Sequence, residues 1–224
     1  MKSDKGILLE KKTIIFDLDG TLLDSLKDIV ISVNQVLEKL GYEAHTQEEY
    51  KQFIGDGAKK LLLRALPNGI SDQTVQKALE LFTDIYSKTI HSNTKPYKGI
   101  YEMLDSLKKN NFSLNLLSNK PHQFTLKYYD IFFKQYEFDF VYGQSEDFPK
   151  KPNPKTALHI ANSLQIASED IYFIGDTSTD IKTANNAKMQ SIGVVWGMRD
   201  ESELKSNGAN YIVHTPSEIL DIVL

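Results

Sequence analysis

The chain has 224 residues and no cysteine, and its 26 lysines and arginines against 30 acidic residues give a formal net charge of −4. Disulfides, thiolate metal sites and a cysteine nucleophile are therefore excluded. A general nucleic-acid binder is disfavoured, since affinity for phosphate backbones depends on clustered cations. The apolar runs are much shorter than the roughly 18 residues of a membrane span, so we expect a cytoplasmic protein with no membrane partner.

The first informative segment is an apolar run that ends in two aspartates and a glycine. Residues 13–21 read Thr-Ile-Ile-Phe-Asp-Leu-Asp-Gly-Thr, which predicts a buried strand of a parallel sheet. Asp17 and Asp19 follow at the edge where open α/β sheets place ligands. Two such close carboxylates favour a compensating cation, and Mg²⁺ prefers hard oxygen ligands. The alternative interpretation is a turn at Asp19-Gly20, with Asp17 as a helix-capping acid.

A second apolar run ends in polar residues suited to phosphate. Residues 112–117 predict another buried strand, and Ser118, Asn119, Lys120 and Pro121 follow it. A hydroxyl and backbone N–H groups at such a strand end can bind phosphate oxygens. The alternative is a helix cap made by Ser118 or Asn119, with Pro121 at the first helical position.

Two further segments supply a cation and more carboxylates. Lys151 lies in Lys-Lys-Pro-Asn-Pro just before an amphipathic helix pattern, and lysine can act as a point charge on phosphate. Residues 171–180 read Ile-Tyr-Phe-Ile-Gly-Asp-Thr-Ser-Thr-Asp, which predicts a strand, a glycine turn and a helix start. Asp176 and Asp180 can share one face there. A solvated loop for Lys151, and helix capping for the two acids, are the alternatives.

Together the four segments resemble the signature of the haloacid dehalogenase-like phosphatase superfamily: Asp-x-Asp-Gly-Thr, a later Ser or Thr, a Lys, and Gly-Asp-x-x-x-Asp. The resemblance covers nearly the whole chain, and stretches such as 193–197 and 208–213 are similar to phosphoglycolate phosphatases. It implies a doubly wound, Rossmann-like parallel sheet with an inserted helical cap. It also implies a Mg²⁺-dependent phosphatase that works through an aspartyl-phosphate.

The resemblance implies a role for each site residue. Asp17 would be the nucleophile and a metal ligand. Asp19 would protonate the leaving oxygen, activate water and bind Mg²⁺ through its backbone carbonyl. The remaining implied roles are metal binding by Asp176, orientation of the metal's waters or of Lys151 by Asp180, and binding of the transferred phosphate by Ser118, Asn119 and Lys151.

The middle of the first half breaks the alternation of strands and helices. Helical periodicity runs through almost all of residues 24–95, and the alternating pattern resumes after Pro96. We therefore expect an α/β catalytic core of residues 1–23 and 96–224, with an all-helical cap inserted at residues 24–95. An insertion directly after the catalytic turn is placed to cover the site and exclude water.

Three helices are predicted within this insertion, over residues 26–40, 58–66 and 72–90. The spacing of Ser25 and Asp28 predicts a capping box at the start of the first helix.

The loop before the second of these helices is a candidate substrate contact. Gly55 and Gly57 flank Asp56, and their N–H groups can meet an anionic substrate at the helix entrance. Lys59 and Arg64, which lie at helical spacing, would add positive charge. A surface ion pair is the alternative for Arg64.

The favoured function is a Mg²⁺-dependent phosphomonoester hydrolase for a small phosphorylated metabolite, with 2-phosphoglycolate as the first candidate. A β-phosphoglucomutase-like phosphomutase or a pyrophosphatase of the same fold stays open, because fold-level analogy does not choose among substrates. A receiver-like phosphorylation module is more remote, since the Asp17-x-Asp19 pair and the helical insertion argue against it. A monomer and a homodimer are both compatible with the sequence.

Overall fold

The structure is a computed structural model that describes residues 12–89 and 92–224. Residues 1–11 of the predicted core, and Ile90 at the end of the third predicted helix, lie outside the described residues. None of the described helices is long and apolar enough to span a membrane.

Six parallel strands form the central sheet, in the order β5-β4-β1-β6-β7-β8. β1 pairs with β4 on one side and β6 on the other, and Phe16 lies opposite Leu116 and Ile174. The carboxyl ends of these three strands therefore meet at one edge, and the predicted doubly wound α/β class is confirmed. The strands are β1 Thr13–Phe16, β4 Ser113–Pro121, β5 Phe140–Gln144, β6 Ile171–Gly175, β7 Gln190–Val194 and β8 Tyr211–Val213.

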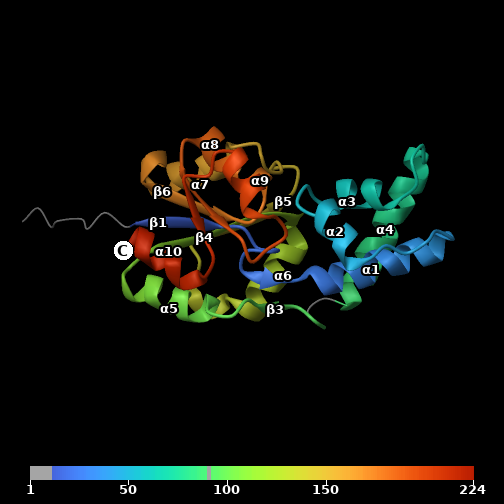
Figure 1. Cartoon of the computed structure of the whole chain (residues 1–224), viewed down its shortest axis with the longest axis horizontal. Helices are drawn as coiled ribbons and strands as arrows, with labels where there is room; N and C mark the ends of the chain where they lie inside the picture. The colour runs from blue at the N-terminus through green and yellow to red at the C-terminus, as the bar shows by residue number, and fades with distance from the viewer. Residues whose placement is uncertain (1–11, 90–91) are drawn as a thin grey trace, which may run out of the picture.

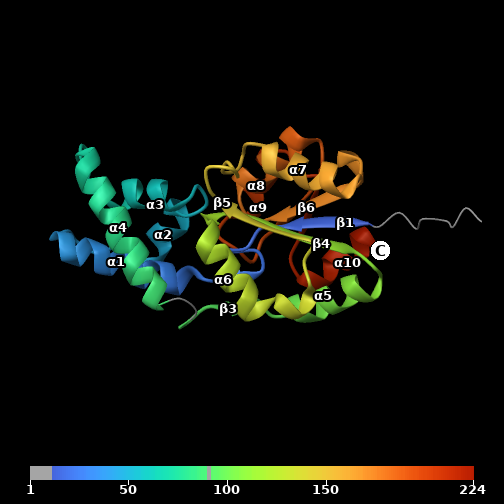
Figure 2. The ribbon, with the colours of Figure 1, turned by 180° about the vertical axis from the view of Figure 1, so that it is seen from behind.

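Helices cover both faces of the sheet (Figures 1 and 2). Ile14 and Phe16 of β1 belong to one hydrophobic cluster, whereas Ile15 packs with Phe173 and Ile160 in another. This two-sided burial explains why β1 is apolar at every position. The helices below the sheet in Figure 1 are α5 Ile100–Lys109, α6 His122–Phe132 and α10 Pro216–Val223, and those above it are α7 Lys155–Leu164, α8 Ser178–Ala187 and α9 Glu201–Ser206. Short 3₁₀ helices occupy Lys134–Tyr136 and Ser168–Asp170.

Four further helices pack together at one end of the molecule, beyond the carboxyl edge of the sheet (Figure 1). They are α1 Leu26–Leu40, α2 Gln47–Phe53, α3 Ala58–Ala65 and α4 Asp72–Thr89. Two short antiparallel strands, β2 Leu23–Asp24 and β3 Lys95–Pro96, carry the chain out of the core and back. The boundaries of a cap at residues 24–95 coincide with this link, and we keep them as a proposal.

The helix starts differ from the sequence prediction at two places. The capping box at Ser25 and Asp28 was wrong, because the Ser25 hydroxyl instead donates to Asp19 Oδ1 at 2.5 Å. Helix α2 was not predicted, although Thr46 and Glu49 form a capping box at its start, and Thr-x-x-Glu is a readable signal for one.

Asp28 ties the two chain crossings together instead of capping a helix. Its buried carboxylate accepts hydrogen bonds from the backbone N–H and side-chain amide of Asn93 and from the N–H and hydroxyl of Thr94, at 2.7–3.0 Å. Burial alone would raise the pKa of Asp28, but these donors outweigh it and lower the pKa. The start of α1 is therefore fixed to the segment that leads back to the core.

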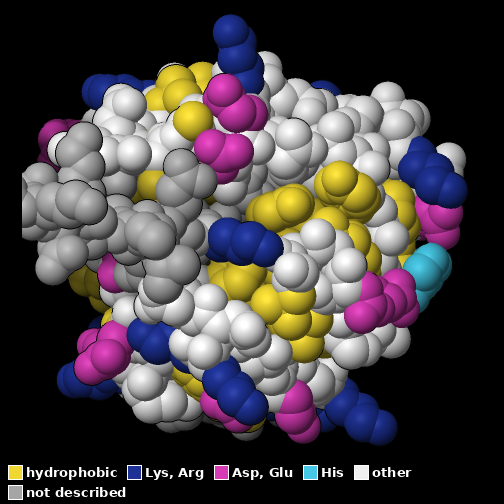
Figure 3. All heavy atoms as spheres, turned by 90° about the vertical axis from the view of Figure 1, so that its left-hand side faces the viewer, with side chains coloured by type: hydrophobic (Ala, Val, Ile, Leu, Met, Phe, Trp, Pro, Cys, Tyr) yellow, Lys and Arg dark blue, Asp and Glu magenta, His cyan; other side chains and the backbone are white. Residues whose placement is uncertain are grey.

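The end of the core remote from the cap has no uniform charge. In Figure 3, lysines, arginines and acidic side chains are interspersed around a hydrophobic patch. Among the described side chains visible on this face, no continuous basic surface forms, as expected from the net negative charge.

We expect Asp28→Asn to lower the free energy of unfolding by about 1–3 kcal/mol at pH 7, because the amide supplies one acceptor oxygen to several buried donors. A carboxylate with a lowered folded-state pKa contributes stability above its unfolded pKa of about 4 and loses it as the pH falls through the folded value. The difference from wild type, measured by urea unfolding, should therefore shrink in acid. A difference that is unchanged between pH 7 and pH 3 would contradict this account.

Candidate active site

Three buried carboxylates and one ammonium gather at the carboxyl edge of the sheet. Asp17 directly follows β1 and Asp176 directly follows β6, while Asp180 lies in the first turn of α8. One carboxylate oxygen from each lies within 4.8 Å of those of the others. The Nζ atom of Lys151 lies 2.6 Å from an oxygen of Asp17 and 2.6 Å from one of Asp180. The sequence named all four residues, and the fold brings them together.

The charges in this cluster do not balance. Burial raises the pKa of Asp17 to about 7, with a further rise from Asp180 and a lowering by Lys151. Burial and the neighbouring carboxylates raise the pKa of Asp176 well above its usual range. Although burial opposes it, Asp17 and Asp180 raise the pKa of Lys151, which stays protonated. Three carboxyl groups thus face one ammonium, and the raised pKa values of Asp17 and Asp176 mean that these groups tend to retain protons unless a further cation joins them.

The donor set suits a hard divalent cation. Asp17 Oδ1 is buried, and its close polar partner is the ammonium of Lys151 at 2.6 Å. Carboxylate oxygens of Asp17, Asp176 and Asp180 form the acidic cluster that could hold a metal ion. Lys151 already occupies one oxygen of Asp180, and Thr177 donates to the other. From the described residues Asp176 accepts only two hydrogen bonds, both from neutral donors, so Asp17 and Asp176 retain more capacity for a metal than Asp180 does.

Small residues and fixed donors shape the space around Asp176. Its oxygens accept from the Thr21 hydroxyl at 3.1 Å and from the Met198 N–H at 2.7 Å. A Cβ added at Gly20 would lie 2.2 Å from Asp176 Oδ2, and one at Gly197 would lie 2.4 Å from the same atom. Glycine at both positions therefore lets the backbone approach the carboxylate closely.

The predicted phosphate-binding residues lie inside β4, which continues to Pro121. Ser118 and Asn119 are buried in this strand, and α6 begins at His122 with Pro121 as its N-cap. Neither Ser118 nor Asn119 caps the helix, and the placement of Pro121 at the first helical position was wrong by one residue. The Asn119 side chain instead donates to the carbonyls of Gly55 and Lys151, at 2.9 and 3.2 Å, and accepts from the Lys151 N–H at 2.7 Å.

Asp19 faces a second buried ammonium, that of Lys120. The Lys120 Nζ donates to both oxygens of Asp19 at 2.9 and 2.8 Å, and to the hydroxyl of Tyr86 in α4 at 2.7 Å. It also lies 4.8 Å from the ring centre of Tyr86 and 4.6 Å from that of Tyr128. No role for Lys120 could be predicted from the sequence, because its partners lie 101 and 34 positions away.

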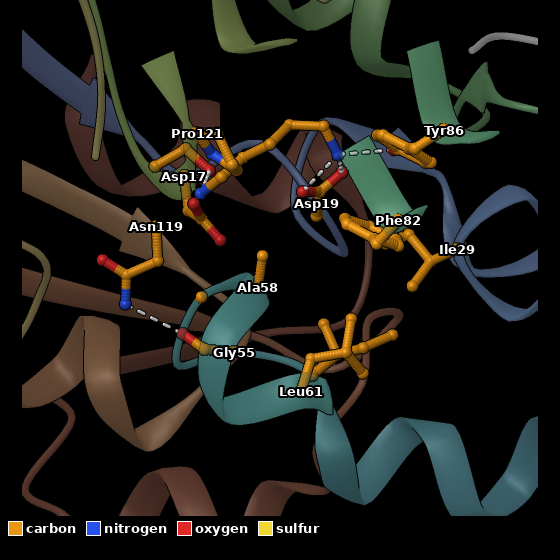
Figure 4. Close-up of a pocket in the computed structure, with 14 residues that line it drawn as sticks. Asp17, Asp19, Ile29, Gly55, Ala58, Leu61, Phe82, Tyr86, Asn119 and Pro121 are labelled. Carbon is orange, nitrogen blue, oxygen red and sulfur yellow. Dashed lines mark hydrogen bonds and ion pairs between the residues drawn. The ribbon is translucent and has the colours of Figure 1, made fainter. Parts of the chain in front are cut away.

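A small cavity of about 60 Å³ lies between the carboxyl edge and the helices of the cap. In Figure 4, Asp17 and Asp19 lie on its core side, opposite Ala58 and Leu61 from α3. The wall facing the carboxylates is largely apolar. Its lining residues are Asp17, Asp19, Ile29, Ile54, Gly55, Gly57, Ala58, Leu61, Phe82, Tyr86, Ser118, Asn119, Lys120 and Pro121.

The predicted cap residues separate into two groups. Gly55 and Gly57 line the cavity, whereas Asp56, Lys59 and Arg64 do not. Arg64 forms an ion pair with Asp56 and donates to the Phe53 carbonyl, so its partners are those of the surface ion-pair alternative.

Arg199 holds the same loop from the core side. Its guanidinium donates to the backbone carbonyls of Lys51 and Ile54, the latter at 2.9 Å, and pairs with Glu203 at 3.2 Å. Since the preceding residue, Met198, donates its N–H to Asp176, adjacent residues contact the acidic cluster and the cap loop. Sequence reasoning missed Arg199, because carbonyl partners leave no signal in side-chain spacing.

The family comparison agrees with this geometry. A family model described as haloacid dehalogenase-like hydrolase matches residues 14–194, and the chain belongs to this family. The resemblance found in the four motifs is therefore confirmed, as is the expectation of a phosphatase.

The most similar relatives match over almost their full length. The chain is 32% identical to phosphoglycolate phosphatase from Vibrio parahaemolyticus, covering 95% of this chain and 96% of the relative. It is 33% identical to phosphoglycolate phosphatase from Vibrio vulnificus strain YJ016, covering 96% and 97%. A crystal structure from Lactobacillus delbrueckii subsp. bulgaricus, provisionally described as a phosphoglycolate phosphatase, matches with a TM-score of 0.88 and 28% identity, covering 95% of this chain and 98% of that one.

We expect Asp176→Asn to stabilise the metal-free protein and to abolish stabilisation by Mg²⁺. Because the pKa of Asp176 is raised in the folded state, this carboxyl group opposes folding above its unfolded pKa of about 4. A neutral amide should therefore raise the unfolding temperature in EDTA at pH 7 by about 2–4 °C, roughly 1 kcal/mol for a chain of this size. Thermal unfolding in EDTA and in excess Mg²⁺ measures both effects, with exposed Asp130→Asn as the control. A variant that is destabilised in EDTA but still responds to Mg²⁺ would contradict the assignment.

We expect Arg199→Gln to raise KM for p-nitrophenyl phosphate about tenfold or more with a smaller change in kcat, because the cap loop loses charge-assisted hydrogen bonds. Faster amide hydrogen exchange in residues 51–57 should accompany the change. Lys205→Gln, which removes an exposed ion pair with Glu201, is the matched control. Unchanged KM and exchange would show that Arg199 does not position the loop.

Proposed function

We propose that the protein is a Mg²⁺-dependent phosphomonoesterase that forms an aspartyl-phosphate on Asp17, with 2-phosphoglycolate as its leading substrate. The observation that carries the proposal is the buried cluster of Asp17, Asp176 and Asp180 around Lys151. Phosphoryl transfer requires mainly positioning and charge stabilisation from the protein. Three carboxyl groups around one ammonium leave the site short of positive charge, and a divalent cation would supply it.

Asp17, Asp176 and the backbone carbonyl of Asp19 are the proposed protein ligands of Mg²⁺, and Asp180 holds Lys151. When bound, the ion would act as a Lewis acid and neutralise charge on the phosphate. Thr21 and Met198 fix the orientation of Asp176 through their hydrogen bonds.

The reaction has two steps. In the first, a carboxylate oxygen of Asp17 attacks phosphorus, the bond to the leaving oxygen breaks, and Asp19 gives its proton to that oxygen. In the second, Asp19 takes a proton from water, which attacks phosphorus and releases inorganic phosphate from Asp17. General acid–base help of this kind contributes roughly 10²–10⁴-fold.

Lys151 and Ser118 are proposed to bind the phosphate oxygens. Lys151 already contacts Asp17 and can offset charge on the transferred group. Ser118 has a buried hydroxyl at the cavity. The side-chain donors of Asn119 are occupied by Gly55 and Lys151, so its proposed contact with phosphate is through its backbone N–H.

The substrate assignment rests on the relatives and on the apolar cap wall of the cavity. Curated relatives that match over nearly their whole length are named phosphoglycolate phosphatase. The largely apolar cap wall, with Ile29, Leu61 and Phe82, offers few hydrogen-bonding groups to a polyhydroxylated leaving group such as a sugar. N–H groups of the Gly55–Gly57 loop are the proposed cap contacts with the substrate, and Lys59 and Arg64 lie outside the cavity lining.

The test is phosphate release from 2-phosphoglycolate, sugar phosphates, nucleoside monophosphates and pyrophosphate, with Mg²⁺ or with EDTA. We expect 2-phosphoglycolate to give the highest kcat/KM, and EDTA or Asp17→Asn to abolish turnover. Asp19→Asn should lose about 10²–10⁴-fold. Slow phosphate release with phosphoenzyme accumulating from acetyl phosphate would favour a phosphomutase or a receiver, and preference for pyrophosphate would favour a pyrophosphatase.

A further inference from the structure

Lys120 carries a buried ammonium that has no role in the proposed hydrolytic steps. Its side chain is 4% exposed, lines the active-site cavity, and bridges Asp19 of the core to Tyr86 of the cap. The rings of Tyr86 and Tyr128 lie within 5 Å of Nζ, so their faces further stabilise the positive charge. Removing a charge from water is costly, and a buried ammonium held in this way is pre-organised for an anion.

Within the described part of the chain, Lys120 is the one cationic side chain that lines the cavity. Lys151 is committed to Asp17 and Asp180 at the phosphate position. Lys59 and Arg64 do not line the cavity. An anionic group on the leaving part of a substrate therefore has one ammonium to meet, that of Lys120.

The position of Lys120 matches the chemistry of a short carboxylate substrate. As the proposed acid, Asp19 would have to come within about 3 Å of the leaving oxygen to transfer its proton. The Lys120 Nζ lies 2.8–2.9 Å from both oxygens of Asp19. In an ester of a 2-hydroxycarboxylic acid one carbon separates the leaving oxygen from the carboxylate, so the carboxylate is short enough to reach the same ammonium.

We propose that Lys120 binds the carboxylate of the substrate and thereby selects phosphate esters of short 2-hydroxycarboxylic acids. This inference rests on the proposed phosphatase function. It extends that function by naming the residue that recognises the leaving group. Lys120 never lacks an anionic partner in this scheme. Asp19 pairs with it in the empty site, and the substrate carboxylate pairs with it when Asp19 carries the proton for the leaving oxygen.

The cap completes the selection. Ile29, Leu61 and Phe82 supply apolar surface opposite the catalytic carboxylates, which leaves a longer polar chain with unsatisfied hydrogen-bonding groups. The Tyr86 hydroxyl fixes Nζ from the cap side at 2.7 Å, and Tyr86 in turn contacts the Tyr128 hydroxyl at 2.8 Å. A small, singly charged leaving group fits these walls.

The experiment compares 2-phosphoglycolate with 2-hydroxyethyl phosphate, a substrate of similar size whose leaving group is neutral. For each enzyme the ratio of the two kcat/KM values is measured with Mg²⁺. We expect wild type to prefer the carboxylate, and Lys120→Met to reduce the preference by about 10- to 100-fold, the value of a hydrogen bond to a charged group. Lys120→Arg, which keeps the charge, should retain most of the preference.

The ratio is independent of the fraction of correctly folded enzyme, so partial misfolding of a variant does not hide the result. Lys127→Met, an exposed lysine of α6, is the matched control and should leave the ratio unchanged. Equal losses on both substrates in Lys120→Met would overturn the proposal, because they would assign Lys120 only to the positioning of Asp19. Wild type that hydrolyses the neutral ester without preferring 2-phosphoglycolate would overturn the substrate assignment and this inference together, but not the phosphatase chemistry.

Discussion

The repulsion among three buried carboxylates at one edge of the sheet is the constraint on which the rest of the site depends. Asp17, Asp176 and Asp180 are each at most 6% exposed, and Lys151 compensates only part of their charge. Such an arrangement weakens the folded state unless a cation joins it. Binding of the proposed divalent ion would therefore be coupled to the geometry proposed to hold a phosphate.

The cap and the core share the residues that hold this geometry. Asn119 bonds to Gly55 of the cap loop and to the backbone of Lys151. Arg199 holds the same loop beside Met198, which orients Asp176. Displacement of the cap loop would therefore remove hydrogen bonds from residues that support catalytic groups. A substrate that fills the cavity would contact the cap and the core at the same time. In this way a cap can couple substrate recognition to the chemical step.

The sequence correctly predicted the position of candidate site residues that lie directly after an apolar strand. Asp17 and Asp176 directly follow apolar strands, so a parallel sheet must bring them to one edge. It was less informative where distant partners decide a side chain's role. Ser25 was predicted to cap α1, yet its backbone has helical rather than the extended angles of a capping residue, and its hydroxyl donates to Asp19. The pairing of Lys120 with Tyr86 depends on how α4 packs against the core, which no local spacing encodes.

Lys120 differs from the cap residues Lys59 and Arg64 in burial. This difference explains why the sequence alone did not identify Lys120 as the residue proposed to bind the leaving group. Lys59 and Arg64 attracted attention because they follow a glycine loop, but Arg64 is partly exposed and already neutralised by Asp56. An exposed charge is screened by water and salt and discriminates weakly between substrates. Lys120 is buried beside the proposed acid. A buried ammonium interacts strongly with an anionic partner, and leaving it without such a partner is energetically costly. Burial, which is known only from the fold, therefore determines which positive charge can discriminate between substrates.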